Sequence, residues 1–151
     1  MENNLIATAS ATINASAAKV WRTITTPSLI KKYLMGTNVS TDWLEGSPIT
    51  YQGEYKGKQY SDKGVIKKLE VGKLLQSTYW SSMGGKEDKP ENYNLVTYKL
   101  QDQFDKTILT LTQDNIKDDK EKEHVQKNWE SVLLKLKETA ESPEVAAGAV
   151  H

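Results

Sequence analysis

Few residues in this sequence could do acid–base or nucleophilic chemistry. It contains two histidines, His124 and His151, and no cysteine. General acid–base catalysis and Ser-His-Asp arrangements usually need a histidine held inside the fold. His151 is the last residue, and His124 follows Glu123 in a charged stretch, one residue before an apolar stripe, as is typical of a surface histidine. The sequence therefore offers no positioned general base.

Carboxylates are numerous, but nearly all stand in charged stretches such as KEDKPE (86–91) and KDDKEKE (117–123). Solvated loops and helix starts of this kind do not provide the shifted pKa values that catalysis needs. Glu54 lies within a predicted strand, but alternation turns it away from Tyr51 and Tyr55 and so outside a cleft. No set of ligands has the spacing of a metal site. We therefore expect no metal, no cofactor and no enzyme activity.

The aromatic residues favour binding. Four Trp and seven Tyr stand against a single Phe. A dry core could use Phe freely, whereas Tyr and Trp bring a hydroxyl or an indole N–H that needs a partner when buried. This composition is typical of an apolar cavity with a few polar groups, the usual character of a small-molecule site. The alternative stays open, because Tyr and Trp also cover half-buried sheets well.

The elements that would position these residues follow from the hydrophobic pattern. A strand over Leu5–Ile13 leads to a helix capped by Ser16. Pro27 breaks this helix, and Ser28 can cap a second short one. From Val39 to Asn115 nearly all of the chain alternates as antiparallel strands. The strand over Leu74–Ser81 has Tyr79 and Trp80 on opposite faces. Tyr93–Gln101 and Thr107–Asp114 are predicted to form a final hairpin, in which Leu109, Leu111 and Gln113 share one face.

The last helix is the clearest element. Asp118 or Asp119 caps it, and its apolar stripe runs to about Glu141. Residues 142–151 are expected to form a frayed tail. The sheet must lay its apolar face against the stripe. The sequence thus predicts an α+β fold over residues 1–141, a single domain in which a curved antiparallel sheet of about six to seven strands surrounds a long C-terminal helix, with two short helices after the first strand.

The concave face of this sheet is the predicted ligand cavity. Four strand tyrosines share that face if the strands alternate as assigned, although a register error of one residue would turn any of them outward. Gln113 is the polar side chain expected to face inward, and Leu34, Met35 and Met83 could form the mouth. Trp43 could instead plug the sheet, and Trp129 could belong to the core. The candidate cavity residues are Tyr33, Leu34, Trp43, Tyr51, Tyr55, Tyr79, Met83, Tyr98, Gln113, Trp129 and Leu133.

Several segments together resemble a known family. ATINASAAKVWRTITTPSLIKKYL (11–34) resembles the opening of START-like (SRPBCC, Bet v 1-like) proteins. DWLEGSPITYQGEYKGKQYSDKGVI (42–66) is similar to the W-x-x-G-s stretch of the branch named after the activator of the heat-shock-protein-90 ATPase, in its small stand-alone bacterial form. PENYNLVTYKL, LTLTQDN and NWESVLLKLK resemble later segments of that branch, in the same order, so that the likeness covers about Leu5 to Glu141.

The resemblance implies a helix-grip fold with a cavity between the sheet and the C-terminal helix. Members of the superfamily bind lipids, sterols or polyketides. The namesake is a co-chaperone that stimulates the chaperone's ATPase and makes its main contacts through a separate N-terminal domain, for which this chain has no room. Two positions depart from bacterial relatives: Tyr33 stands where they often have Trp, and Asn128 where they often have Gly.

Composition bears on the remaining partner classes. Lys plus Arg and Asp plus Glu each number 20, so there is no surplus positive charge for nucleic acid. No segment approaches the about 20 apolar residues that span a bilayer, and the first residues lack the features of a signal peptide. We expect a cytoplasmic protein, and the oligomeric state stays open.

Two functions remain. The first is non-catalytic binding of a hydrophobic or amphipathic small molecule, lipid-like or aromatic. The alternative is a chaperone-associated protein-interaction module that uses the convex sheet or the loop at 82–91. Catalysis through cavity polar groups and water is a third possibility, for which the sequence supplies no base.

Overall fold

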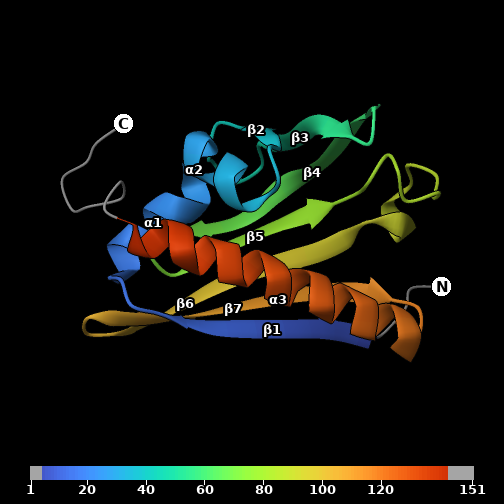
Figure 1. The fold of residues 1–151 in the computed structure, drawn as a ribbon. Helices are drawn as coiled ribbons and strands as arrows, with labels where there is room; N and C mark the ends of the chain where they lie inside the picture. Colours follow the sequence, from blue (N-terminus) through green and yellow to red (C-terminus); the bar gives the residue numbers. More distant parts are fainter. Residues whose placement is uncertain (1–4, 143–151) are drawn as a thin grey trace.

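The structure, a computed structural model, describes residues 5–142 (Figure 1). Apart from Ser142, the predicted C-terminal tail with His151 lies outside the described residues. The elements in chain order are β1 (Leu5–Ile13), α1 (Ala17–Thr25), α2 (Pro27–Tyr33), β2 (Asn38–Ser40), β3 (Pro48–Tyr55), β4 (Lys58–Glu70), β5 (Leu74–Tyr79), the 3-10 turn η1 (Pro90–Asn92), β6 (Asn94–Gln103), β7 (Lys106–Ile116) and α3 (Asp119–Glu141).

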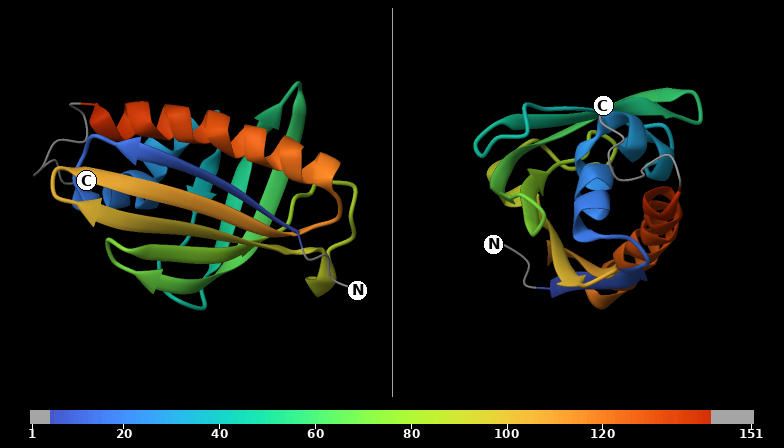
Figure 2. Two further views of the ribbon diagram at one scale, coloured as in Figure 1. Left: turned by 90° about the horizontal axis from the view of Figure 1, so that it is seen from below. Right: turned by 90° about the vertical axis from the view of Figure 1, so that its left-hand side faces the viewer.

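The strands form one antiparallel sheet of seven strands in the order β1-β7-β6-β5-β4-β3-β2. The sheet curls so that α3 lies along its concave side, and α1 and α2 close one end (Figure 2). The long helix packs mainly on β1 and α2. This is the predicted α+β helix-grip fold, with the two short helices after the first strand.

The ends of the first and last helices follow the predicted caps. The Ser16 hydroxyl accepts a hydrogen bond of 3.2 Å from the Lys19 amide. The Asp118 carboxylate accepts one of 2.8 Å from the Glu121 amide, so Asp118 rather than Asp119 is the cap of α3. Each cap satisfies an amide at a helix start that has no partner within the helix.

The second helix starts earlier than expected. Ser28 was predicted to cap it, but α2 begins at Pro27, and Thr26 precedes it without a capping side-chain bond. Proline suits the first helical position because its missing N–H would have no partner there. The break that Pro27 makes in α1 is therefore also the start of α2.

The final hairpin is tighter than the sequence suggested. The strands were predicted to end at Gln101 and restart at Thr107, but pairing continues to Gln103 opposite Lys106. Phe104 takes a positive φ of 67° in the turn and is 97% exposed. The alternation of polar and apolar residues fades before the hydrogen-bonded ladder ends, and this explains the difference.

Strand β4 approaches the next strand very closely at Gly64. It pairs with β3 up to Val65, and with the β5 side through an isolated bridge between Lys63 and Trp80 and then from Ile66 onward. A Cβ atom added at Gly64 would lie 1.7 Å from the carbonyl oxygen of Thr78. Glycine inside a strand often marks such a close approach of two backbones. The backbones of β4 and the end of β5 therefore lie very close together at this point, beside the site described below.

The core lies where α3 covers the sheet at the end closed by α1. Leu109 and Leu111 of β7 are fully buried, as the alternation of that strand predicted. They join Leu136 and Ala140 of α3, both also at 0% exposure. The core ends short of the other end of α3, where half-buried aromatic residues replace the aliphatic ones.

Candidate functional site

A cavity of about 300 Å³ lies between α3 and the concave face of the sheet. Every strand from β3 to β7 contributes to its wall, together with α3 and the segment that follows α2. The lining residues are Leu34, Thr37, Tyr51, Tyr60, Asp62, Tyr79, Val96, Tyr98, Gln113, Val125, Asn128, Trp129 and Val132.

A second cavity, of about 420 Å³, adjoins the first and opens toward solvent. The two share Leu34, Tyr79 and Val132 among other residues. We call the first the inner cavity and the second the outer cavity. The mouth of the outer cavity carries exposed side chains from the segment after α2, from β3, from the loop after β5 and from α3, among them Met35, Glu54, Tyr55, Met83 and Lys135.

Most of the predicted cavity residues come together here. The inner cavity is lined by Leu34, Tyr51, Tyr79, Tyr98, Gln113 and Trp129, and the outer one adds Tyr33, Tyr55 and Met83. Trp43 and Leu133 line neither of these two cavities. Trp43 packs at the edge of the core with a positive φ of 57°, and Leu133 is 2% exposed on the core side of α3.

Sequence reasoning missed Asp62, Tyr60 and Thr37 in the wall of the cavity. A signal for Asp62 existed, because alternation along β4 puts it on the same face as Tyr60 and the fully buried Ile66. Glu54, expected outside the cleft, is exposed but reaches the mouth of the outer cavity.

Asp62 is the buried carboxylate of the site, at 6% exposure. The Tyr79 hydroxyl donates a hydrogen bond of 2.5 Å to its Oδ2 atom. The backbone N–H and the hydroxyl of Ser82 both donate to Oδ1, at 2.9 and 3.3 Å. All three partners act as donors, which is the pattern that an ionised carboxylate accepts.

Other polar contacts hold the aromatic walls in place. The indole N–H of Trp129 on α3 donates a hydrogen bond of 2.9 Å to Oε1 of Gln113 on β7. Gln113 is the glutamine that was predicted to face inward. Trp129 also meets Tyr98 edge-on, with ring centroids 6.2 Å apart. Tyr51 meets Tyr79 in the same way at 5.5 Å. Edge-on contacts are favoured between aromatic rings and fix their orientation.

Burial changes the acidity of the tyrosines around the cavity. It raises the pKa of Tyr51 to about 12, a net value that includes a decrease from a hydrogen bond with Ser77 and an increase from the charge of Asp62. Burial also raises the pKa values of Tyr33, Tyr79 and Tyr98 well above the usual one. The neutral phenols are therefore strongly preferred in the folded state.

These pKa values predict loss of stability in alkali. Between the ordinary pKa of 10.0 and the folded value of about 12 for Tyr51, the folded state binds more protons than the unfolded state. The contribution of these phenols to stability is therefore complete below pH 10 and decreases as the pH rises above it. We expect phenolate absorbance from the cavity tyrosines to appear only as circular dichroism shows unfolding. Ionisation of all seven tyrosines near pH 10 with the fold intact would contradict this.

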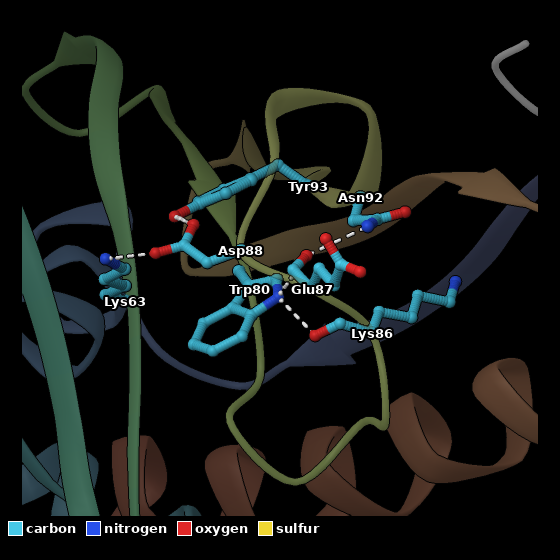
Figure 3. A network of polar contacts seen from close by, with 7 residues as sticks. All are labelled: Lys63, Trp80, Lys86, Glu87, Asp88, Asn92 and Tyr93. Carbon is cyan, nitrogen blue, oxygen red and sulfur yellow. Dashed lines mark hydrogen bonds and ion pairs between the residues drawn. The ribbon is translucent and has the colours of Figure 1, made fainter.

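The loop from Ser81 to Tyr93, which carries Ser82 and Met83, is held from the outside as well (Figure 3). Lys63 forms an ion pair of 2.5 Å with Asp88, and the Tyr93 hydroxyl donates to the same carboxylate at 2.5 Å. Both contacts lower the pKa of Asp88. Asp62 and Lys63 thus hold the loop from opposite faces of β4.

The Trp80 ring completes the outer network. Its indole N–H donates to the backbone carbonyls of Lys86 and Glu87 at 3.2 and 3.1 Å, and its ring stacks on Tyr93 (Figure 3). Tyr79 and Trp80 lie on opposite faces of the strand end, as alternation predicted. Trp80 therefore belongs to the loop network and Tyr79 to the cavity.

His124, the histidine within the described residues, lines neither the inner nor the outer cavity. His124 is exposed on α3, where its Nε2 atom lies 3.4 Å from the Asn128 amide nitrogen. Within residues 5–142, no three His, Cys, Asp or Glu side chains are arranged to hold a metal ion. No helix in that same range is both long and apolar enough to cross a bilayer.

Several solved structures have an architecture similar to that of this chain. The solution structure of ChR145 from Cytophaga hutchinsonii is 42% identical, covers 97% of this chain and 100% of its own, and superposes with a TM-score of 0.82. The Aha1 dimer from Colwellia psychrerythraea is 21% identical over 91% of this chain and 96% of that one, with a TM-score of 0.71. CalU16 from Micromonospora echinospora is 20% identical over 95% and 88%, with a TM-score of 0.68.

The last two likenesses concern the fold alone, because their identity is low. A search of curated proteins gives no match. The sequence model described as "Activator of Hsp90 ATPase homolog 1-like protein" matches residues 14–141, which include every residue of both cavities. The chain therefore belongs to the family of activator of Hsp90 ATPase homolog 1-like proteins.

Proposed function

We propose that this protein binds a hydrophobic or amphipathic small molecule in the cavity between the sheet and α3, without catalysing a reaction. The observation that carries the proposal is the inner cavity itself, about 300 Å³ in volume and lined largely by aromatic and aliphatic side chains. Small-molecule sites typically begin at roughly this volume and combine such walls with a few polar groups.

The wall is built in a way that keeps the cavity open. Tyr79 is tied to Asp62 and Trp129 to Gln113. The Tyr60 hydroxyl shares a hydrogen bond of 2.6 Å with Thr37, while its ring covers Gly53 on the neighbouring strand. Rings that are held by their polar ends cannot collapse inward without losing buried hydrogen bonds. This favours a space that an apolar ligand fills over a gap that the core could close.

Filling the inner cavity with a side chain tests the proposal. Val132 is half-buried on α3 and lines both cavities, so the indole of Val132→Trp would occupy the space. We expect N-phenyl-1-naphthylamine, a neutral apolar dye, to gain fluorescence with the wild-type protein and not with this variant. Leu134→Trp is the matched control, because Leu134 lies on the same helix at 65% exposure.

Native mass spectrometry of protein purified without detergent provides the second measurement. We expect an added mass that is lost under denaturing conditions and absent from Val132→Trp. A bare chain mass, together with a dye that responds to neither the wild-type protein nor the control, would overturn the proposal. A dye response that Val132→Trp leaves unchanged would move binding away from this cavity.

The second candidate is a chaperone-associated role, supported by the description of the family and by a relative named Aha1. It would use an outer surface, such as the loop at 82–91, and not the cavity. The ATPase rate of a purified Hsp90 should then increase when the chain is added, and Val132→Trp should stimulate it equally. An unchanged ATPase rate at saturating concentrations of the chain would remove this candidate.

A further inference from the structure

We propose that the ligand carries an organic ammonium group, which binds Asp62, and an apolar body, which lies between Tyr98 and Trp129. This rests on the proposed function, since it names the class of molecule that the same cavity takes. Three features of the site support this: the Asp62 carboxylate can accept one more hydrogen bond, no ion pair among the described residues includes it, and aromatic rings lie next to it.

The Asp62 carboxylate has room for one more donor. Two carboxylate oxygens offer about four lone-pair positions. Ser82 occupies two of them at Oδ1, and the Tyr79 hydroxyl occupies one at Oδ2. Asp62 lines both the inner and the outer cavity, so the remaining position is accessible from the side where a ligand would lie.

Within residues 5–142, hydrogen-bond donors and no ion pair meet the charge of Asp62. None of the ion pairs among the described residues includes Asp62. Its sequence neighbour Lys63 points to the outer face and pairs with Asp88. Lys135 and Glu54 carry opposite charges at the exposed mouth. Burying a carboxylate without a cation costs free energy. The site would therefore bind a ligand with an ammonium group much more favourably than a ligand with a second carboxylate.

The rings next to Asp62 also suit a cation. Tyr79 contacts the carboxylate through its hydroxyl and meets Tyr51 edge-on at 5.5 Å. Tyrosine faces attract ammonium groups, and more strongly when water is excluded. Tyr98 and Trp129 lie farther along the inner cavity and present apolar surface. An amine with an aromatic or aliphatic body matches this division into a charged end and an apolar end.

Three ligands that share the same apolar body but differ in their polar end separate the effect of charge on affinity from the effect of hydrophobicity. 4-Phenylbutylamine, 4-phenylbutan-1-ol and 4-phenylbutanoate are titrated into ¹⁵N-labelled full-length protein at neutral pH, and affinities are taken from amide chemical shifts. We expect the amine to bind roughly ten-fold more tightly than the alcohol, as a hydrogen bond to a charged partner allows, and the carboxylate to bind most weakly. Shifts should include the Tyr79 and Ser82 amides.

Asp62→Asn removes the charge and retains the shape. The asparagine oxygen can still accept from Ser82, and the Tyr79 hydroxyl can accept from its amide, so the loop contacts have replacements. We expect the preference for the amine over the alcohol to disappear while the affinity for the alcohol is retained. Asp102→Asn is the matched control, because Asp102 is exposed on the β6–β7 hairpin.

The outcomes distinguish the two proposals. Equal binding of amine and alcohol by the wild-type protein would overturn the ammonium inference and leave the binding function standing, and this comparison does not depend on any variant folding. Binding of neither, together with no response to N-phenyl-1-naphthylamine, would overturn both. An amine preference that survives in Asp62→Asn would place the cation elsewhere and also overturn the inference.

Discussion

Gly64→Ala is expected to destabilise the protein by about 3 kcal/mol or more, because a methyl group has no space between β4 and β5. The added Cβ would lie 1.7 Å from the Thr78 carbonyl oxygen and 3.2 Å from the Tyr79 amide nitrogen. Both are backbone atoms, so no side chain can rotate away, and the two strands must separate. Chemical denaturation followed by circular dichroism measures the loss.

The same substitution should also weaken the candidate site. Tyr79 follows Thr78 directly, and its hydroxyl reaches across to Asp62, two residues before Gly64. Separation of the strands would therefore lengthen this hydrogen bond and open the loop contact with Ser82. We expect the dye response to fall even at temperatures where Gly64→Ala remains folded.

Gly84→Ala is the matched control for this prediction. A Cβ at Gly84 would have its nearest neighbour at 3.5 Å, an ordinary contact, and the residue lies in the loop after β5. We expect its stability to stay within about 0.5 kcal/mol of wild type, as is usual for surface positions. Equal stability of Gly64→Ala and Gly84→Ala would show that the strands do not approach as closely as described.

Leu136→Ala should produce the second large effect, a loss of about 2–5 kcal/mol, which is typical of a deleted core leucine. Leu136 has 0% exposure and packs in the cluster that joins α3 to β7 through Leu109 and Leu111. The substitution removes apolar contact and leaves a cavity that rigid strands cannot fill. The free energy of unfolding from denaturant titration gives the value.

Leu134→Ala on the same helix provides the comparison. Leu134 is 65% exposed, so its truncation should change the free energy of unfolding by less than about 0.5 kcal/mol. The pair separates burial from helix propensity, because both variants replace leucine with alanine within α3. Similar losses in the two variants would contradict the packing of α3 on the sheet.

Much of the fold could be predicted from local patterns. Alternation in β7 separates the buried Leu109 and Leu111 from the opposite face, and the stripe on α3 includes the buried Leu136 and Ala140. Caps at Ser16 and Asp118 mark the two main helix starts. These signals depend on neighbours along the chain, so one sequence is enough to read them.

The candidate site was only partly predictable. Alternation predicted that Tyr51, Tyr79 and Tyr98 share the concave face, and all three line the inner cavity. The apolar stripe of α3 gave no reason to leave Leu133 out of the predicted cavity wall. Leu133 follows Val132 on this helix but points to the core. A stripe identifies the buried side of a helix and does not say which part of that side faces empty space.

Sequence alone thus determined the order of the elements, the faces they bury and the aromatic character of the wall. Tertiary structure decided that Asp62 borders the cavity whereas Ile66, on the same face of β4, lies in the core. Between them, at Gly64, the Thr78 backbone of the next strand approaches too closely for a side chain, and the pairing of β4 with β5 shifts its register after Ile66. Contacts across strands and with α3 decide which part of one face meets the core and which part meets a cavity, and the alternation of side chains along one strand carries no record of them.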